Sequence, residues 1–197
     1  MTLNSFLQSK KITHLEGHVQ GSSGKIETLK QLVNTPGVVE VMEIGFNAGH
    51  SAEIFLSSNP NIKLTSFDIG HHTYLLQGKQ YIDTTFPNRH QLVIGDSLLS
   101  VPNYIRDHPE KKFDLILIDG GHTYEIAKGD LYNCKSLAHE NTIVVMDDTM
   151  FTEGWSHEYN IGPSKIWSES IDNKFITEIN RIDYSSGMGL SWAKYNF

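Results

Sequence analysis

The chain has 197 residues and a formal net charge of −7, a length that can bury one sizeable hydrophobic core. Its acidic balance, without a block of lysine or arginine, disfavours nucleic acid as a substrate. No apolar run approaches the ~20 residues that span a bilayer, and the opening MTLNSFLQSKK lacks the apolar core of a signal peptide, so we expect a cytoplasmic protein with no membrane partner.

The first 36 residues are polar and predict two short helices. Ser5 is a candidate N-cap for the first helix, and the apolar spacing of residues 25–33 predicts the second. Three titratable residues of the connection are close in sequence: His14, Glu16 and His18. They are either solvated loop residues or part of a substrate lid over the ligand-binding end of the sheet. We therefore expect a single domain, with residues 1–36 as a helical lid segment and residues 37–197 as an α/β core.

A buried strand, a glycine-rich turn and the start of a helix follow one another in residues 38–51, VVEVMEIGFNAGHS. The run up to Ile44 is apolar enough for a strand covered on both faces, and Glu43 interrupts it. A buried carboxylate needs a partner, and a ligand hydroxyl or amino group would serve. Gly45 and Gly49 bracket a turn in which the backbone can come close to a ligand.

Two further strands are expected over residues 62–69 and 89–95, with a helix over about 73–85 between them. Asp68 ends the first of these strands about 20 residues after the glycine turn, where a carboxylate can accept from two ribose hydroxyls in a doubly wound sheet. His71 and His72 follow directly and either line a cofactor pocket or lie on the surface. Asp96 begins the turn after the next strand.

Carboxylates also end the strands predicted at residues 113–119 and 142–146, namely Asp119 and the pair Asp147-Asp148. Ligands bind at the carboxyl ends of strands in open α/β sheets, so these side chains are candidate site residues. A helix starting at Gly162-Pro163 and two antiparallel strands, residues 174–182 and 190–195, complete the chain.

The pattern E-x-G-x-x-x-G resembles motif I of the class I S-adenosylmethionine (SAM)-dependent methyltransferases. It differs from the dinucleotide fingerprint because Asn47 stands where that fingerprint has a glycine, which disfavours a nicotinamide cofactor. The resemblance implies a doubly wound, mostly parallel seven-stranded sheet with a C-terminal antiparallel hairpin. It also implies a set of SAM-binding residues, with Asp96 meeting the adenine: Glu43, Gly45, Asn47, Gly49, Asp68 and Asp96.

The acids at the later strand ends resemble those of metal-dependent O-methyltransferases of the catechol and macrocin type. The resemblance implies that Asp119, Asp147 and Asp148 hold a divalent cation such as Mg²⁺, which would lower the pKa of a substrate hydroxyl. Macrocin-type enzymes carry a further acid where this chain has Gly121. The next residue, His122, is our candidate general base, and Asp119 is the second candidate catalytic residue. A helix-capping role would also explain a histidine at position 122.

These patterns predict a SAM-dependent methyltransferase that acts, with a divalent cation, on a hydroxyl of a small molecule such as a sugar or phenol. A catalytically silent binding module with the same fold is the alternative, followed by a nicotinamide-dependent oxidoreductase. Four aromatic residues could wall an acceptor pocket or belong to the core: Tyr74, Trp155, Tyr159 and Trp167. The acceptor is not specified by the sequence, and a homo-oligomer is left open.

Overall fold

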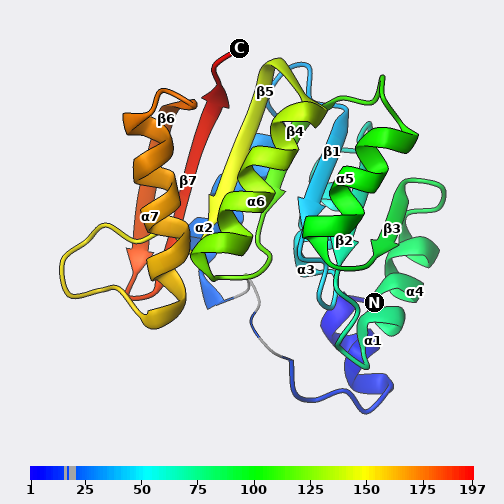
Figure 1. Ribbon diagram of the computed structural model, residues 1–197. Coiled ribbons are helices and arrows are strands. Elements are labelled where there is room, and N and C mark those ends of the chain that lie inside the picture. The colour runs from blue at the N-terminus through cyan, green and yellow to red at the C-terminus, as the bar shows by residue number, and fades with distance from the viewer. Residues whose placement is uncertain (16, 18–20) are drawn as a thin grey trace.

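A seven-stranded sheet lies between two layers of helices in the computed structural model, which describes residues 1–15, 17 and 21–197 (Figure 1). The strands are β1 (Glu40–Ile44), β2 (Lys63–Asp68), β3 (His90–Ile94), β4 (Phe113–Ile118), β5 (Ala138–Asp147), β6 (Ile176–Ser185) and β7 (Met188–Tyr195). Their order is β3-β2-β1-β4-β5-β7-β6, and β1 to β5 are parallel while β7 runs antiparallel to both its neighbours. The predicted sheet with its C-terminal antiparallel hairpin is confirmed.

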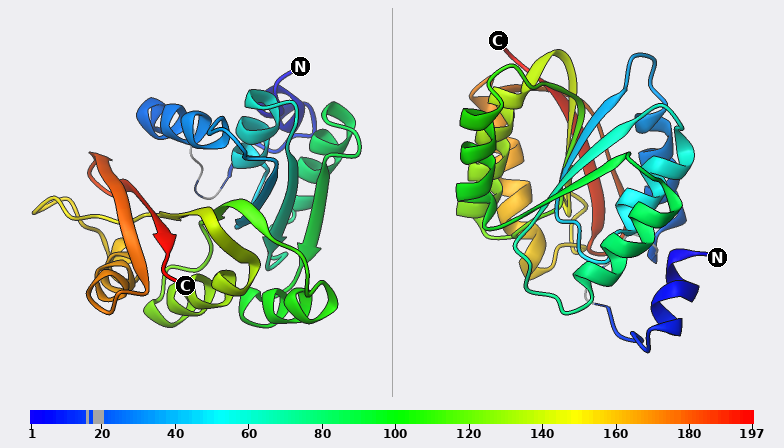
Figure 2. Two further views of the ribbon diagram at one scale, coloured as in Figure 1. Left: turned by 90° about the horizontal axis from the view of Figure 1, so that it is seen from above. Right: turned by 90° about the vertical axis from the view of Figure 1, so that its right-hand side faces the viewer.

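The helices cover both faces of this sheet (Figure 2). One face carries α2 (Ser23–Val33), α3 (His50–Ser58) and α4 (Leu75–Thr85), with α1 (Leu3–Ser9) packed against α4. The other face carries α5 (Ser97–Asp107), α6 (Tyr124–Cys134) and α7 (Glu158–Asp172), and the 3₁₀ turn η2 (Lys135–Leu137) follows α6. Within the described part of the chain, no helix combines the length and apolar character needed to span a membrane.

Two hydrophobic clusters form the core, one on each face of the sheet. Successive strand residues point to opposite faces, so Val41 packs into one cluster and its neighbour Met42 into the other. Both residues are fully buried. The central strands are therefore apolar on both faces, and a polar side chain on them stands out as a candidate for another role.

The structure differs from the prediction at three helices, two in their start and one in its existence. Thr2, not Ser5, caps α1, and Ser5 makes the reciprocal bond to the Thr2 backbone. The prediction had no helix after Asp96, where α5 runs through Pro102. Helix α7 begins before Gly162-Pro163, because the Asn160 side chain accepts a hydrogen bond from the His157 N–H at 3.0 Å and closes the helix start there.

Candidate functional site

The turn after β1 brings the chain against the end of β4. Gly45 has φ +99°, and a Cβ at this position would lie 1.9 Å from the carbonyl oxygen of Asp119. Gly49 has φ +92° and stands at the N-cap of α3. Only glycine meets both demands at Gly45, the left-handed backbone and the close approach to another backbone. The turn is therefore built directly onto the strand end that carries Asp119.

Glu43 lies behind this turn, within the sheet, with 0% of its surface exposed. Its two carboxylate oxygens accept hydrogen bonds from the hydroxyls of Ser51 and Ser66, each at 2.6 Å. Burial raises the pKa of Glu43 to about 7. The ligand group expected as its partner is thus replaced by two serine hydroxyls, and Glu43 supports the turn rather than lining the cavity in front of it.

Asp68 and Asp96 lie farther along the same edge of the sheet, and both line the cavity described below. Asp68 accepts hydrogen bonds from the backbone N–H groups of Asn47 at 2.7 Å and Gly70 at 2.8 Å. Asp96 caps α5 by accepting from the Leu98 N–H at 2.9 Å. Asp68 thereby ties the glycine turn to the end of β2, and each of its oxygens keeps a lone pair for a ligand.

A cavity of about 850 Å³ opens over the carboxyl ends of the parallel strands. Eight of its lining residues are predicted site residues: Gly45, Asn47, Asp68, Asp96, Asp119, His122, Asp147 and Asp148. This volume is in the upper part of the ~300–1,000 Å³ range of small-molecule sites, which leaves room for two ligands. The cavity joins the glycine-turn side of the sheet edge to the acidic side.

Other predicted residues are divided between the cavity and the core. His71, His72 and Tyr159 line the cavity, whereas Trp167 is a fully buried core residue and Tyr74 is 8% exposed within the core. Gly17 of the N-terminal segment also lines the cavity, and its carbonyl accepts from the Asn47 side-chain amide at 3.0 Å. His14 is exposed, and the predictions for Glu16 and His18 concern residues outside the described ranges.

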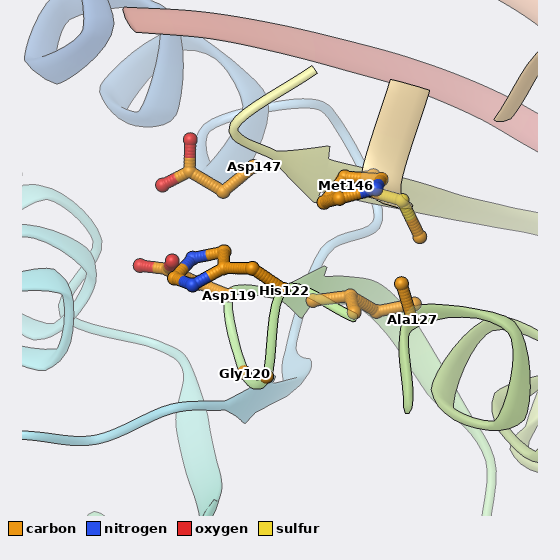
Figure 3. Close-up of a pocket in the computed structure, with 9 residues that line it drawn as sticks. Asp119, Gly120, His122, Ala127, Met146 and Asp147 are labelled. Carbon is orange, nitrogen blue, oxygen red and sulfur yellow. The ribbon is translucent and has the colours of Figure 1, made fainter. Parts of the chain in front are cut away.

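The acidic side of the cavity is formed by the ends of β4 and β5. Asp119, His122 and Asp147 extend toward the same side in Figure 3, away from Met146 and Ala127. Neighbouring residues of a strand normally face opposite ways, but Asp148 has φ +55°, and this turn lets both Asp147 and Asp148 face the cavity. The Asp148 N–H also donates to Asp147 Oδ1 at 2.7 Å.

The site contains a cation that the sequence prediction missed, the side chain of Lys25 on α2. Its Nζ lies 2.5 Å from Asp147 Oδ1 and 3.8 Å from Asp148 Oδ1, and the residue is 6% exposed. Burial alone would lower the pKa of Lys25, but the charges of Asp147, Asp119 and Asp148 outweigh it and raise this pKa above its usual value. Lys25 is therefore an ammonium ion within an acidic cluster, which consists of Asp119, Asp147 and Asp148. The only sequence signal was a lysine in the first turn of a helix, where the helix dipole disfavours a cation.

His122 and Asp119 also have shifted pKa values. The hydrogen bond with Asp148, His122 Nε2 to Oδ2 at 2.9 Å, raises the pKa of His122. Burial and the adjacent Asp147 charge raise the pKa of Asp119 well above its usual range. Each acid of the cluster thus has its own means of limiting repulsion: Asp147 has Lys25, Asp148 has His122, and Asp119 retains its proton more readily.

Asp119, His122 and Asp148 each offer a ligand atom within 4.8 Å of the others, a spacing that could hold an ion. The predicted set had Asp147 in place of His122. In the structure Asp147 Oδ1 is paired with the Lys25 ammonium, so an ion bound to the three carboxylates would share that oxygen with a second cation. The chain therefore fits the predicted three-carboxylate Mg²⁺ set poorly.

The fold is similar to that of solved O-methyltransferases. One is an O-methyltransferase from Bacillus cereus in complex with SAH, with 18% identity and a TM-score of 0.78 over 98% of this chain and 90% of that one. Another is TomG from Streptomyces achromogenes, in complex with SAM, with 14% identity and a TM-score of 0.75 over 99% of this chain and 88% of that one. A third is CalS11, a TDP-rhamnose 3'-O-methyltransferase of calicheamicin biosynthesis, with 18% identity and a TM-score of 0.67 over 98% of this chain and 87% of that one.

No curated protein matches this chain. The model of a family described as a methyltransferase domain matches residues 42–149, more than half of the sequence. The matched region runs from β1 to the end of β5 and so contains the glycine turn and all three acids of the cluster. The resemblance to the class I methyltransferases is confirmed: the chain belongs to the methyltransferase-domain family.

Proposed function

We propose that the protein transfers a methyl group from SAM to a hydroxyl oxygen of a small molecule. One observation carries this proposal, namely that a single cavity joins the glycine turn and Asp68 to the acidic cluster and His122. A cofactor bound at the turn and an acceptor bound at the cluster would then meet inside one cavity. The O-methyltransferase neighbours support the same reaction class.

On the cofactor side, we propose that Asp68 accepts hydrogen bonds from the ribose hydroxyls and that Asp96 meets the adenine. Gly45, Asn47 and Gly49 would bring the backbone close to the methionine end, while Glu43 holds the turn through Ser51. SAM, when bound, supplies an electrophilic methyl group on its sulfonium sulfur.

On the acceptor side, His122 is the proposed general base. When Nε2–H of the neutral ring donates to Asp148, Nδ1 is left to take the proton from the acceptor hydroxyl. The oxygen–methyl bond then forms as the sulfur–methyl bond breaks, and the proton stays on His122, where the Asp148 carboxylate stabilises the charged ring. Asp148 acts here as the orienting partner of the base, in the way that a carboxylate orients a catalytic histidine elsewhere.

Isothermal titration with SAM tests the cofactor proposal. We expect saturable binding that weakens by about 10- to 100-fold in Asp68→Ala, because a carboxylate that accepts hydrogen bonds from ligand hydroxyls contributes about 1.5–3 kcal/mol. Asp83→Ala on α4 is the matched control, since Asp83 pairs with Lys79 away from the cavity. An absence of SAM binding to the wild-type protein would refute the proposed function.

The base is tested by methyl transfer from labelled SAM to a panel of phenols and sugars. We expect His122→Gln to lower the turnover number by about 100-fold, the lower range for loss of a general base, while SAM affinity is unchanged. His139→Gln is the control, because His139 pairs with Asp114 at the opposite ends of the strands. Unchanged turnover in His122→Gln would leave His122 as a helix-terminal residue without a catalytic role.

A further inference from the structure

The buried Lys25 ammonium is placed with precision by the packing of α2. The Ser22 hydroxyl caps this helix by accepting from the Lys25 N–H at 3.2 Å. Gly24 lies against Tyr184 of β6 so closely that a Cβ would be 2.7 Å from the ring, and the Tyr184 hydroxyl donates to Thr28 Oγ1 at 2.6 Å. The helix is thus fixed against the C-terminal hairpin on both sides of Lys25, and the side chain reaches the end of β5.

This placement is unfavourable for the helix itself. Lys25 is the third residue of α2, and the N-terminal end of a helix carries partial positive charge, which disfavours a cation. Burial adds a desolvation cost, which only paired charges offset. Both costs are balanced by one set of partners, the carboxylates of Asp147 and Asp148. The role of Lys25 therefore lies in the acidic cluster and not in the stability of α2.

We propose that Lys25 is the permanent cation of this site and takes the place of the divalent ion, so that the protein works without a bound metal. The cluster holds three carboxylates, and the chain supplies a positive or titratable partner to two adjacent ones, Lys25 to Asp147 and His122 to Asp148. Lys25 also lines the cavity, and an ammonium group has three protons, of which Asp147 accepts one. The remaining protons can stabilise the negative charge that develops on an acceptor oxygen, which is the electrostatic role of a metal in such a reaction.

This inference rests on the proposed function, but it makes a separate prediction about metal binding. The probe is Mn²⁺ alone, followed by electron paramagnetic resonance on the full chain. We expect the wild-type protein to bind Mn²⁺ no more tightly than about 1 mM, the range of weak carboxylate sites. In Lys25→Met the uncompensated carboxylates should bind Mn²⁺ at least about tenfold more tightly, because removal of the ammonium leaves like charges in need of a cation.

Lys30→Met, an exposed change on the same helix, is the matched control and should behave as the wild-type protein does. Lys25→Gln serves as a second variant if the methionine variant does not fold. The Mn²⁺ affinity of the wild-type protein tests the proposal without either variant. Wild-type binding of Mn²⁺ at micromolar concentration would overturn the proposal, as would unchanged Mn²⁺ affinity in folded Lys25 variants. SAM is titrated into the same wild-type sample. An absence of SAM binding counts against the proposed function, whereas micromolar Mn²⁺ binding counts only against the role of Lys25.

Discussion

Replacing Gly45 by alanine is expected to lower the free energy of unfolding by about 3–5 kcal/mol, the sum of a left-handed backbone strain and an overpacking clash. The new Cβ would lie 1.9 Å from the Asp119 carbonyl oxygen, and neither atom belongs to a flexible side chain. Either the turn or the end of β4 must move. Urea unfolding measures the loss of stability, and we expect SAM binding to fall with it because the turn and Asp119 line the same cavity.

Gly37→Ala separates the two causes of this loss. Gly37 has nearly the same φ, +93° against +99°, but no atom of the residues that the structure describes lies within 4 Å of the position that its Cβ would take. It should lose only the cost of the left-handed conformation, about 1–2 kcal/mol. If both variants lost the same stability, the close approach of β1 and β4 at this point would be refuted.

The strand ends were predictable because they depend on local signals. Apolar runs ending in Asp68, Asp119 and Asp147 predict parallel strands, and parallel strands place their carboxyl ends at one edge. The order of the strands in the sequence was therefore enough to predict that these acids lie at one edge of the sheet. The cavity opens over this same edge of the sheet.

The partners of these acids were not predictable in the same way. Lys25 precedes Asp147 by 122 positions, and its contact depends on how α2 packs against Tyr184, which no periodicity encodes. Glu43 was expected to face a ligand because a buried carboxylate needs a partner. The partners are instead two serines, one on α3 and one on β2, since a neighbouring hydroxyl satisfies a carboxylate as well as a ligand does. Sequence reasoning found which residues need a partner, and the packing decided which partner they have.

Glu43→Gln is expected to stabilise the protein at pH 8 by up to about 3 kcal/mol, because the folded state holds this carboxyl at a pKa of about 7, whereas a glutamate carboxyl ordinarily has a pKa of 4.5. In the wild-type protein the folded state binds the proton more tightly than the unfolded chain does. Stability from this group is therefore fully present below pH 4.5 and is lost as the pH rises through about 7. The glutamine variant has no such loss, so the difference between the two proteins should grow over this interval and remain constant above it.

The surrounding hydrogen bonds can accommodate the amide. The glutamine oxygen can accept from Ser51, and its N–H can donate to Ser66, whose hydroxyl then donates to His90 Nε2, 2.8 Å away. Burial lowers the pKa of His90 to about 4, so this ring is neutral and able to accept at pH 8. Urea unfolding of both proteins from pH 5 to about 8 measures the effect, with the exposed Glu27→Gln as the control. Parallel curves for wild-type and Glu43→Gln would show that Glu43 is already ionised without cost in the folded protein, and that its two serine partners fully offset its burial.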